Sequence, residues 1–169
     1  QIHSVGHPAF SYYVFKQVYN ESGAPIEGLY VDLNKDGIIN EQDLYHYKSP
    51  APSLSFGFNT QLTYKQWDMR MVLRANFNNY VYNNGRSGAT YANINTGGGF
   101  VSNLRRDVLE TNFAGTIPYR LQSDYWIENA SFLRMDNINL GYNFSKLFND
   151  KINLRVSASC QNVFVVTKY

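Results

Sequence analysis

The twelve residues from Asp32 to Asp43 have the spacing of a metal-binding loop. Side chains with oxygen donors occupy the first, third, fifth and twelfth positions (Asp32, Asn34, Asp36 and Asp43), and Gly37 is the sixth residue. An EF-hand calcium loop has this spacing, although it usually carries Glu at the last position. Ca²⁺ takes about 6–8 oxygen ligands, so the four side chains and the carbonyl of Ile38 are the predicted calcium ligands.

Two interpretations of this loop stay open. The residues before it are strand-like, so an isolated dockerin-like loop with a structural Ca²⁺ fits better than a helix–loop–helix EF-hand. Asp, Asn and Gly also favour turns that need no metal, so an Asx-rich turn would use the same residues. If an ion binds, Asp43 is shorter than the usual Glu, and we expect a weak affinity of about 10⁻⁴–10⁻³ M.

The rest of the sequence does not indicate catalysis. His3, His7 and His46 lack the spacing of metal ligands, and no GxSxG nucleophile motif occurs. We therefore expect no catalytic residue and no enzyme activity. The net charge of +2, with Arg105-Arg106 as the single adjacent basic pair, indicates no nucleic-acid partner. One cysteine excludes an internal disulfide.

Long amphipathic strands are the elements that would position polar side chains. Apolar and polar residues alternate over residues 53–64 and 67–82, and again over 131–144 and 152–164. The two arms of the first hairpin exceed the usual strand of about 5–6 residues and reach the roughly 9–11 that a tilted membrane strand needs. Short connections at 65–66 and 145–151 alternate with long ones, as in outer-membrane barrels.

We predict an all-β fold on this basis: an antiparallel transmembrane β-barrel segment that makes up only part of a barrel. Its short turns would be periplasmic and its long loops extracellular. Residues 1–52 would form an extracellular loop region that includes the 32–43 loop. Residues 53–169 would form the barrel part, interrupted by an extracellular loop at 83–130. The leading alternative is a soluble or surface Ca²⁺-binding β domain that acts in adhesion or carbohydrate binding.

The polar sides of the strands predict a water-filled lumen. Alternating charges on a strand are more typical of a lumen ladder than of an active site. The predicted lumen-facing residues are Asp68, Arg70, Arg74, Asn76, Asn78, Asn153, Arg155 and Gln161. Four aromatic residues could stack on sugar rings, with packing inside the loops as the alternative: Tyr91, Tyr119, Tyr125 and Trp126. If the polar faces packed a core, the soluble alternative would hold instead.

A set of short motifs in a fixed order also resembles a known family. The motifs are Val5–Pro8, Val31–Gly37, Ser49–Pro52, Asn129–Met135, Asn137–Tyr142 and Gln161–Tyr169. Together they span nearly the whole chain. They are similar to the C-terminal part of SusC/RagA-type TonB-dependent transporters of Bacteroidetes.

The resemblance implies an outer-membrane barrel of about 22 strands in contact with lipid. It also implies an N-terminal plug, energy from TonB–ExbB–ExbD, and a SusD-like surface lipoprotein as a lid. Such proteins import oligosaccharides or peptides. The sequence starts without Met and carries no plug, TonB box or terminal strand of the family, so we expect it to be part of a longer protein.

Overall fold

The computed structural model describes residues 2–88, 103, 105–115, 122–147 and 152–169, apart from the side chains of residues 146 and 147. The chain divides into two compact units. The first combines Gln1–Ala51 with Tyr80–Glu128, and the second combines Pro52–Asn79 with Asn129–Tyr169. Each unit is therefore built from two stretches that lie far apart in the sequence.

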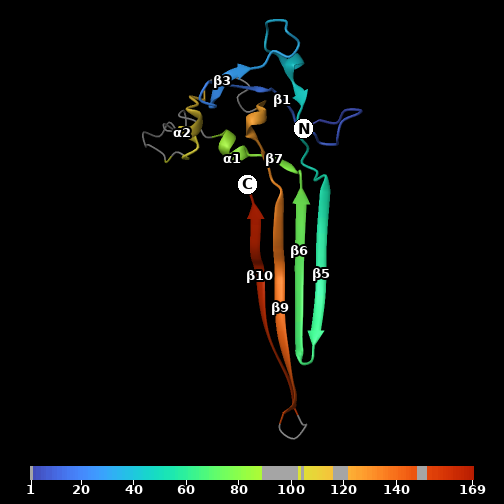
Figure 1. The fold of residues 1–169 in the computed structure, drawn as a ribbon. Helices are drawn as coiled ribbons and strands as arrows, with labels where there is room; N and C mark the ends of the chain where they lie inside the picture. Colours follow the sequence, from blue (N-terminus) through green and yellow to red (C-terminus); the bar gives the residue numbers. More distant parts are fainter. Residues whose placement is uncertain (1, 89–102, 104, 116–121, 148–151) are drawn as a thin grey trace. The chain divides into compact units, whose positions relative to one another are not determined.

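The second unit is a four-stranded antiparallel sheet with the order β10-β9-β6-β5 (Figure 1). Its strands are β5 (Leu54–Tyr64), β6 (Trp67–Phe77), β9 (Phe132–Leu147) and β10 (Ile152–Thr167). They contain 11, 11, 16 and 16 residues. All four are long enough for the roughly 9–11 residues of a membrane strand.

A tight turn at Lys65-Gln66 joins β5 to β6. Tyr64 pairs with Trp67, so the connection is two residues long, and Lys65 adopts a φ of 52° in the left-handed region. Two-residue hairpins commonly need such a residue, because the turn must follow the right-handed twist of the strands. The pairing continues without a shift from this turn to Leu54 and Phe77, so the apolar residues of both strands lie on the same face.

A β-bulge at Asp136 shifts the alternation in β9. Val72 of β6 pairs with Asn137 and Leu73 pairs with Met135, so Asp136 has no direct partner on β6. An extra residue moves every following side chain to the other face of the strand. The bulge therefore places Met135 and Ile138 on one face, although three positions separate them.

Three strand ends differ from the prediction. β6 ends at Phe77 rather than at residue 82, because Asn78 adopts a φ of 57° and leaves the extended conformation. Residues Tyr80–Tyr82 form a separate strand, β7, which pairs with β8 (Ile127–Asn129). At the other ends, β9 runs on to Leu147 and β10 to Thr167.

The sheet has no hydrophobic core of its own. Among the described residues of this unit, Ala75 is the only buried apolar side chain. Large apolar side chains on one face stay open, including Leu54 (60% exposed), Phe56 (53%) and Val156 (54%). A soluble domain would have to cover such a surface, so this arrangement does not favour the soluble alternative.

The described part of the chain contains no helix that is both long and apolar enough to cross a membrane.

The first unit holds short elements around a small aromatic core. Its strands are β1 (Tyr13–Val14), β2 (Gln17–Tyr19), β3 (Pro25–Tyr30) and β4 (Tyr45–His46), in addition to β7 and β8. Its helices are α1 (Asn84–Ser87), α2 (Val108–Thr111) and the 3₁₀ turns η1 (Glu41–Asp43) and η4 (Asp124–Trp126). Tyr12, Val14 and Ile127 form a buried cluster, against which Tyr45, Tyr80 and Tyr82 pack.

Buried polar contacts connect distant parts of the first unit. The Ser123 hydroxyl donates to Oε1 of Gln17 at 2.7 Å. The side-chain nitrogen Nε2 of Gln17 donates to the backbone carbonyl of Ile26, also at 2.7 Å. The Tyr45 hydroxyl donates to Oδ2 of Asp124 at 2.6 Å, and burial raises the pKa of Tyr45. Paired in this way, these groups do not carry the cost of unsatisfied buried polar atoms.

Candidate functional site

The polar face of the four-stranded sheet gathers charged and amide side chains from several strands. It is the face that carries Asp68, Arg70 and Arg74 of β6, and we call the opposite side the apolar face. Pairing places Arg70 beside Gln61 of β5 and Asn139 of β9. A hollow on the polar face is lined by Gln61, Thr63, Asp68, Arg70, Asn137, Asn139, Asn143, Arg155 and Ser159.

An ion pair between Asp68 and Arg155 spans three strands in this hollow. Nη2 of Arg155 lies 2.6 Å from Oδ1 of Asp68, and Nε lies 3.1 Å from Oδ2. Asn143 also donates to Oδ2 at 3.4 Å. Because β9 separates β10 from β6, the Arg155 side chain has to cross β9 to reach its partner. This bidentate geometry fixes the position of both charges.

Gly141 makes this crossing possible. It is the residue of β9 that pairs with Asp68 on one side and Ser157 on the other. A Cβ atom at this position would lie 2.6 Å from Oδ2 of Asp68 and would collide with the Arg155 guanidinium. A side chain of any size would therefore compete with the ion pair for the same space.

A second charged cluster surrounds the bulge. Oδ2 of Asp136 lies 2.6 Å from Nε of Arg74, and Oδ1 lies 2.7 Å from Nε of Arg134. Arg134 also donates to the side chain of Asn162 on β10. With Arg70, the described side chains of the polar face carry four arginines and two aspartates, an excess of two positive charges. Such a surface favours water and polar solutes over apolar contact.

The remaining predicted lumen residues have different positions. Gln161 pairs with Asn137 on the polar face, and Asn76 pairs with Ser55 of β5. Asn153 belongs to β10, at an irregularity in its pairing with β9. Asn78 lies beyond the end of β6, and its amide donates to the Ser53 hydroxyl at 3.0 Å. Asn78 therefore supports the end of the hairpin rather than continuing the ladder.

Sequence reasoning did not include Arg134 and Asp136 in this site. A strict period of two predicts the same face for Arg134, Asp136 and Ile138, whereas the bulge separates Arg134 from Ile138. One signal was available in the sequence. The apolar positions Met135 and Ile138 are three apart, and an odd spacing between apolar runs indicates a bulge.

The 32–43 loop bends through internal hydrogen bonds. The Asp32 carboxylate accepts from the backbone N–H of Lys35 at 2.6 Å and of Gly37 at 2.8 Å. Both of these residues have positive φ, 62° and 81°. Asp36 accepts from the N–H of Ile38 and from the Asn34 amide, each at 2.8 Å. Asx-type turns therefore account for much of the loop shape.

Asp43 differs from the other predicted ligands because it is fully buried. Its Oδ1 accepts from the N–H of Leu33 at 2.8 Å, and its Oδ2 accepts from the N–H of Asn40 at 3.0 Å. Asn40 and Asp43 form a capping box at η1. Among the described residues, no group of three or more His, Cys, Asp or Glu side chains is arranged to hold a metal ion.

Comparison with known proteins identifies the family. No family model matches the chain. The TonB-dependent receptor SusC of Bacteroides thetaiotaomicron is 42% identical over 177 residues, which cover 100% of this chain and 17% of SusC. The chain is a segment of a SusC/RagA-like TonB-dependent receptor.

Other relatives of this receptor segment agree. TonB-dependent receptor P3 of Formosa agariphila is 28% identical over 186 residues, covering 95% of the segment and 18% of P3. A chain of the RagAB peptide transporter has the same fold, with a TM-score of 0.69 and 21% identity, over 94% of the segment and 19% of that chain. The predicted family and the predicted antiparallel, partial-barrel fold are confirmed.

Two of the four aromatic residues predicted to bind sugars lie within the described part of the receptor segment. Trp126 is 1% exposed and packs edge-on against Phe113 and Tyr125, with ring centroids 5.8 and 4.8 Å away. A buried ring cannot stack on a sugar, so the structure corrects the prediction for Trp126 and gives it a packing role. Tyr125 is half-buried, and the Arg86 guanidinium carbon lies 5.8 Å from the centre of its ring. Tyr91 and Tyr119 lie outside the described residues.

We predict that acid loosens the 32–43 loop through Asp43. The hydrogen bond from the Asn40 N–H, followed by those from Leu33 and Asn34, lowers the pKa of Asp43 below its ordinary 3.8. A lowered pKa means that folding stabilises the ionised form. The stabilisation is therefore complete above the ordinary, unfolded-state pKa of 3.8, and it is lost as pH falls through the lower folded-state pKa.

Hydrogen exchange in the full-length receptor measures this effect at the amides of Leu33 and Asn40. Their protection should drop as the solution is acidified. Asp43→Asn should lower the protection of one of the two amides at neutral pH, because Asn keeps a single acceptor oxygen and its nitrogen cannot accept a hydrogen bond. Glu41→Gln, two residues before Asp43 and exposed, is the control. Unchanged protection in Asp43→Asn would contradict the assigned role.

Proposed function

We propose that this segment forms C-terminal barrel strands of a SusC-like TonB-dependent importer in the outer membrane. The importer would take up oligosaccharides or peptides, driven by TonB–ExbB–ExbD through parts of the protein outside this segment. The 42% identity to SusC over the whole segment carries the proposal. Because the segment spans only 17% of SusC and 18% of P3, activity and partners belong to the longer protein and remain proposals.

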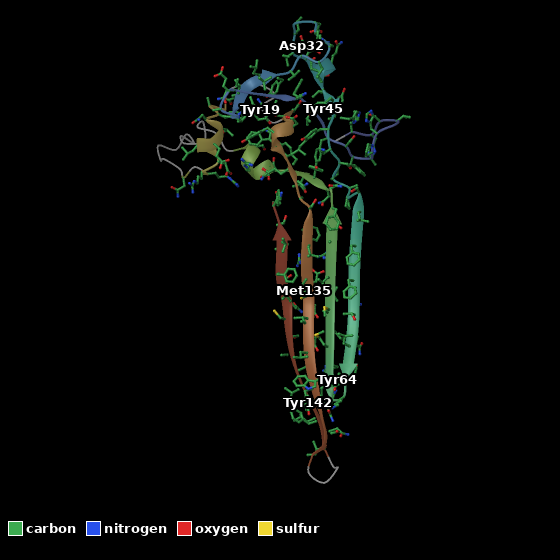
Figure 2. The ribbon with its side chains drawn as sticks, in the orientation of Figure 1. Tyr19, Asp32, Tyr45, Tyr64, Met135 and Tyr142 are labelled. Carbon is green, nitrogen blue, oxygen red and sulfur yellow. The ribbon has the colours of Figure 1, made fainter. Side chains whose placement is uncertain are left out.

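The two faces of the sheet support this function. The polar face offers arginines, aspartates and amides to water, as the wall of a passage for polar solutes would. The apolar face is exposed along all four strands, as a surface in contact with lipid would be. Figure 2 shows side chains along all four strands of the sheet. Neither face resembles an enzyme active site.

A SusD-like lipoprotein is the proposed partner. The SusC/RagA family, to which the identity with SusC points, motivates this partner, and the structural match to a chain of the RagAB transporter, at 21% identity, concerns the fold alone. In the proposed topology, the first unit belongs to the extracellular side, where such a lipoprotein would bind.

Gene deletion in the source bacterium tests the function. The deletion strain should fail to grow on one class of oligosaccharide or peptide as sole nutrient and should grow normally on the corresponding monomers. The full-length gene should restore growth. Affinity purification of the tagged receptor from outer membranes should recover a lipoprotein in equal amount. Normal growth of the deletion strain on every oligomer tested would refute the import proposal, and a receptor purified alone would refute the partner.

We also propose that the 32–43 loop binds a structural Ca²⁺. The donors Asp32, Asn34 and Asp36 and the Ile38 carbonyl are all oxygen atoms, which suit this cation. The structure uses Asp43 differently, as an acceptor for backbone N–H groups, so we expect fewer ligands than in an EF-hand and correspondingly weak binding. The ion would draw Asp32 and Asp36 together and would have no chemical role.

Calorimetry on the full-length receptor checks calcium binding. Wild-type protein should give a binding heat at roughly millimolar Ca²⁺, and the double variant Asp32→Ala/Asp36→Ala should give none. Glu41→Ala removes an exposed carboxylate of the same loop that is not a predicted ligand, and it should behave as wild type. Absence of heat in the wild type would leave the Asx-rich turn as the explanation of the motif.

A further inference from the structure

The apolar face of the second unit contains a hollow near the β5–β6 turn. It is lined by Trp67, Leu140, Tyr142, Phe144, Val156, Ser157 and Ala158. These residues come from β6, β9 and β10. All but Ser157, which pairs with Gly141 on the polar face, lie on the side of the sheet opposite to Asp68 and Arg155. Trp67 is 47% exposed and Phe144 is 40% exposed, so both rings remain open to an occupant.

A ridge of aromatic rings borders this hollow. The Trp67 and Tyr142 rings lie 4.8 Å apart at an angle of 70°, and the Tyr142 and Phe144 rings lie 4.6 Å apart at 66°. Edge-to-face contacts of this kind hold rings in fixed orientations. The neighbouring strand β10 carries smaller side chains, with Val156 paired to Tyr142 and Ala158 paired to Leu140. The drop from large to small side chains creates the hollow.

A cation follows at the turn beside this hollow. Tyr64 pairs with Trp67, and Lys65 comes next, with its ammonium nitrogen 5.3 Å from the centre of the Tyr64 ring. Gln66 joins the turn to β9, because its carbonyl accepts from the N–H of Asn143 at 2.9 Å. Figure 2 labels Tyr64 and Tyr142 at the same end of the sheet. An apolar channel and a positive charge therefore occur together at this end.

We propose that this hollow binds one anionic phospholipid of the periplasmic leaflet. One acyl chain would lie along the aromatic ridge over Val156 and Ala158, and the phosphate would contact Lys65. The inference rests on the proposed outer-membrane location, with the short turns facing the periplasm, and it goes beyond transport.

An acyl chain fits the chemistry of the hollow better than a peptide does. Peptide strands bind by hydrogen bonds to a free strand edge, whereas this hollow lies on the face of the sheet, over the paired strands β6 and β9 and the β9-facing side of β10. The lining is almost entirely apolar, so it offers shape and contact rather than directional bonds. Lys65 supplies the charge complementarity for a phosphate, and aromatic rings are typical of the interface between acyl chains and headgroups.

Native mass spectrometry of the full-length receptor tests the proposal, with phosphatidylglycerol and phosphatidylethanolamine added in detergent. Wild-type receptor should retain one more phosphatidylglycerol than Ala158→Phe, in which a ring fills the hollow. Val166→Phe is the matched control. It lies on the same face of the same strand, is 63% exposed, and should retain lipid as wild type does.

Lys65→Gln tests the headgroup contact separately from the acyl-chain contact. Lys65 lies in the exposed turn outside the paired strands. The substitution should lower retention of phosphatidylglycerol more than that of phosphatidylethanolamine, whose own ammonium group neutralises its phosphate. Heat-dependent electrophoretic mobility would show that each variant is folded, and nutrient uptake should be unchanged, which keeps this test separate from the transport proposal. Equal lipid retention by wild type and Ala158→Phe, or a protein in place of the lipid, would overturn the proposal.

Discussion

Replacing Leu73 by Arg is expected to block assembly of the full-length receptor into the outer membrane. Leu73 lies near the middle of β6 on the apolar face, where it pairs with Phe58 of β5 and Met135 of β9. An arginine on the lipid side of a barrel costs about 2–4 kcal/mol near the middle of the bilayer. The amount of heat-modifiable receptor in isolated outer membranes measures the effect.

Val72→Arg is the matched control for this change. Val72 is the adjacent residue of the same strand, and its partners Asn59 and Asn137 place it on the polar face. The same arginine should be tolerated there, because water reaches a lumen wall. If both variants assembled equally well, the assignment of the lipid and lumen faces would be wrong.

Gly141→Ala should break the Asp68–Arg155 ion pair and destabilise the barrel wall. The new methyl group would occupy the space through which the Arg155 side chain crosses β9. Both groups of the ion pair are the ends of flexible side chains that can move aside, so the cost is the loss of a partly exposed ion pair, about 0–1 kcal/mol. Unfolding of the full-length receptor by denaturant, followed by loss of its heat-modifiable form, would report the change.

Two comparisons make this test specific. Gly57→Ala lies on the polar face of β5, where an added Cβ would meet nothing within 4 Å, so stability should stay the same or rise. In an Arg155→Ala background, Gly141→Ala should lose most of its effect, because the competing side chain is gone. A full effect in that background would show that Gly141 acts through something other than the ion pair.

The four long strands could be predicted from the sequence because alternation of apolar and polar residues is a local pattern. Alternation with a period of two assigns each side chain of a paired strand to a face, and Asp68, Arg70 and Arg155 were placed on the polar face in this way. The turn at Lys65-Gln66 was visible as the break between two alternating runs. The ordered motifs gave the family, which the identity to SusC confirms.

The bulge at Asp136 was not predicted, because a strict period of two has no place for an extra residue. The strands of the loop region were also missed in part. Residues 80–82 alternate like the end of β6, but Asn78 turns the chain and gives them a different partner, β8. Partner choice depends on residues far along the chain, which local patterns do not contain.

Side-chain chemistry and strand periodicity can both be read from the residue order, so the faces that meet lipid and water were predictable. Which residues contact one another depends on how distant segments pack. Arg155 finds Asp68 across 87 positions of sequence, and Gly141 leaves the space between them. Packing between distant segments also buries Trp126 and brings Asp43 to the backbone N–H groups that it accepts from. Burial and hydrogen-bond partners arise from packing between distant segments, and a pattern of residue types does not specify them.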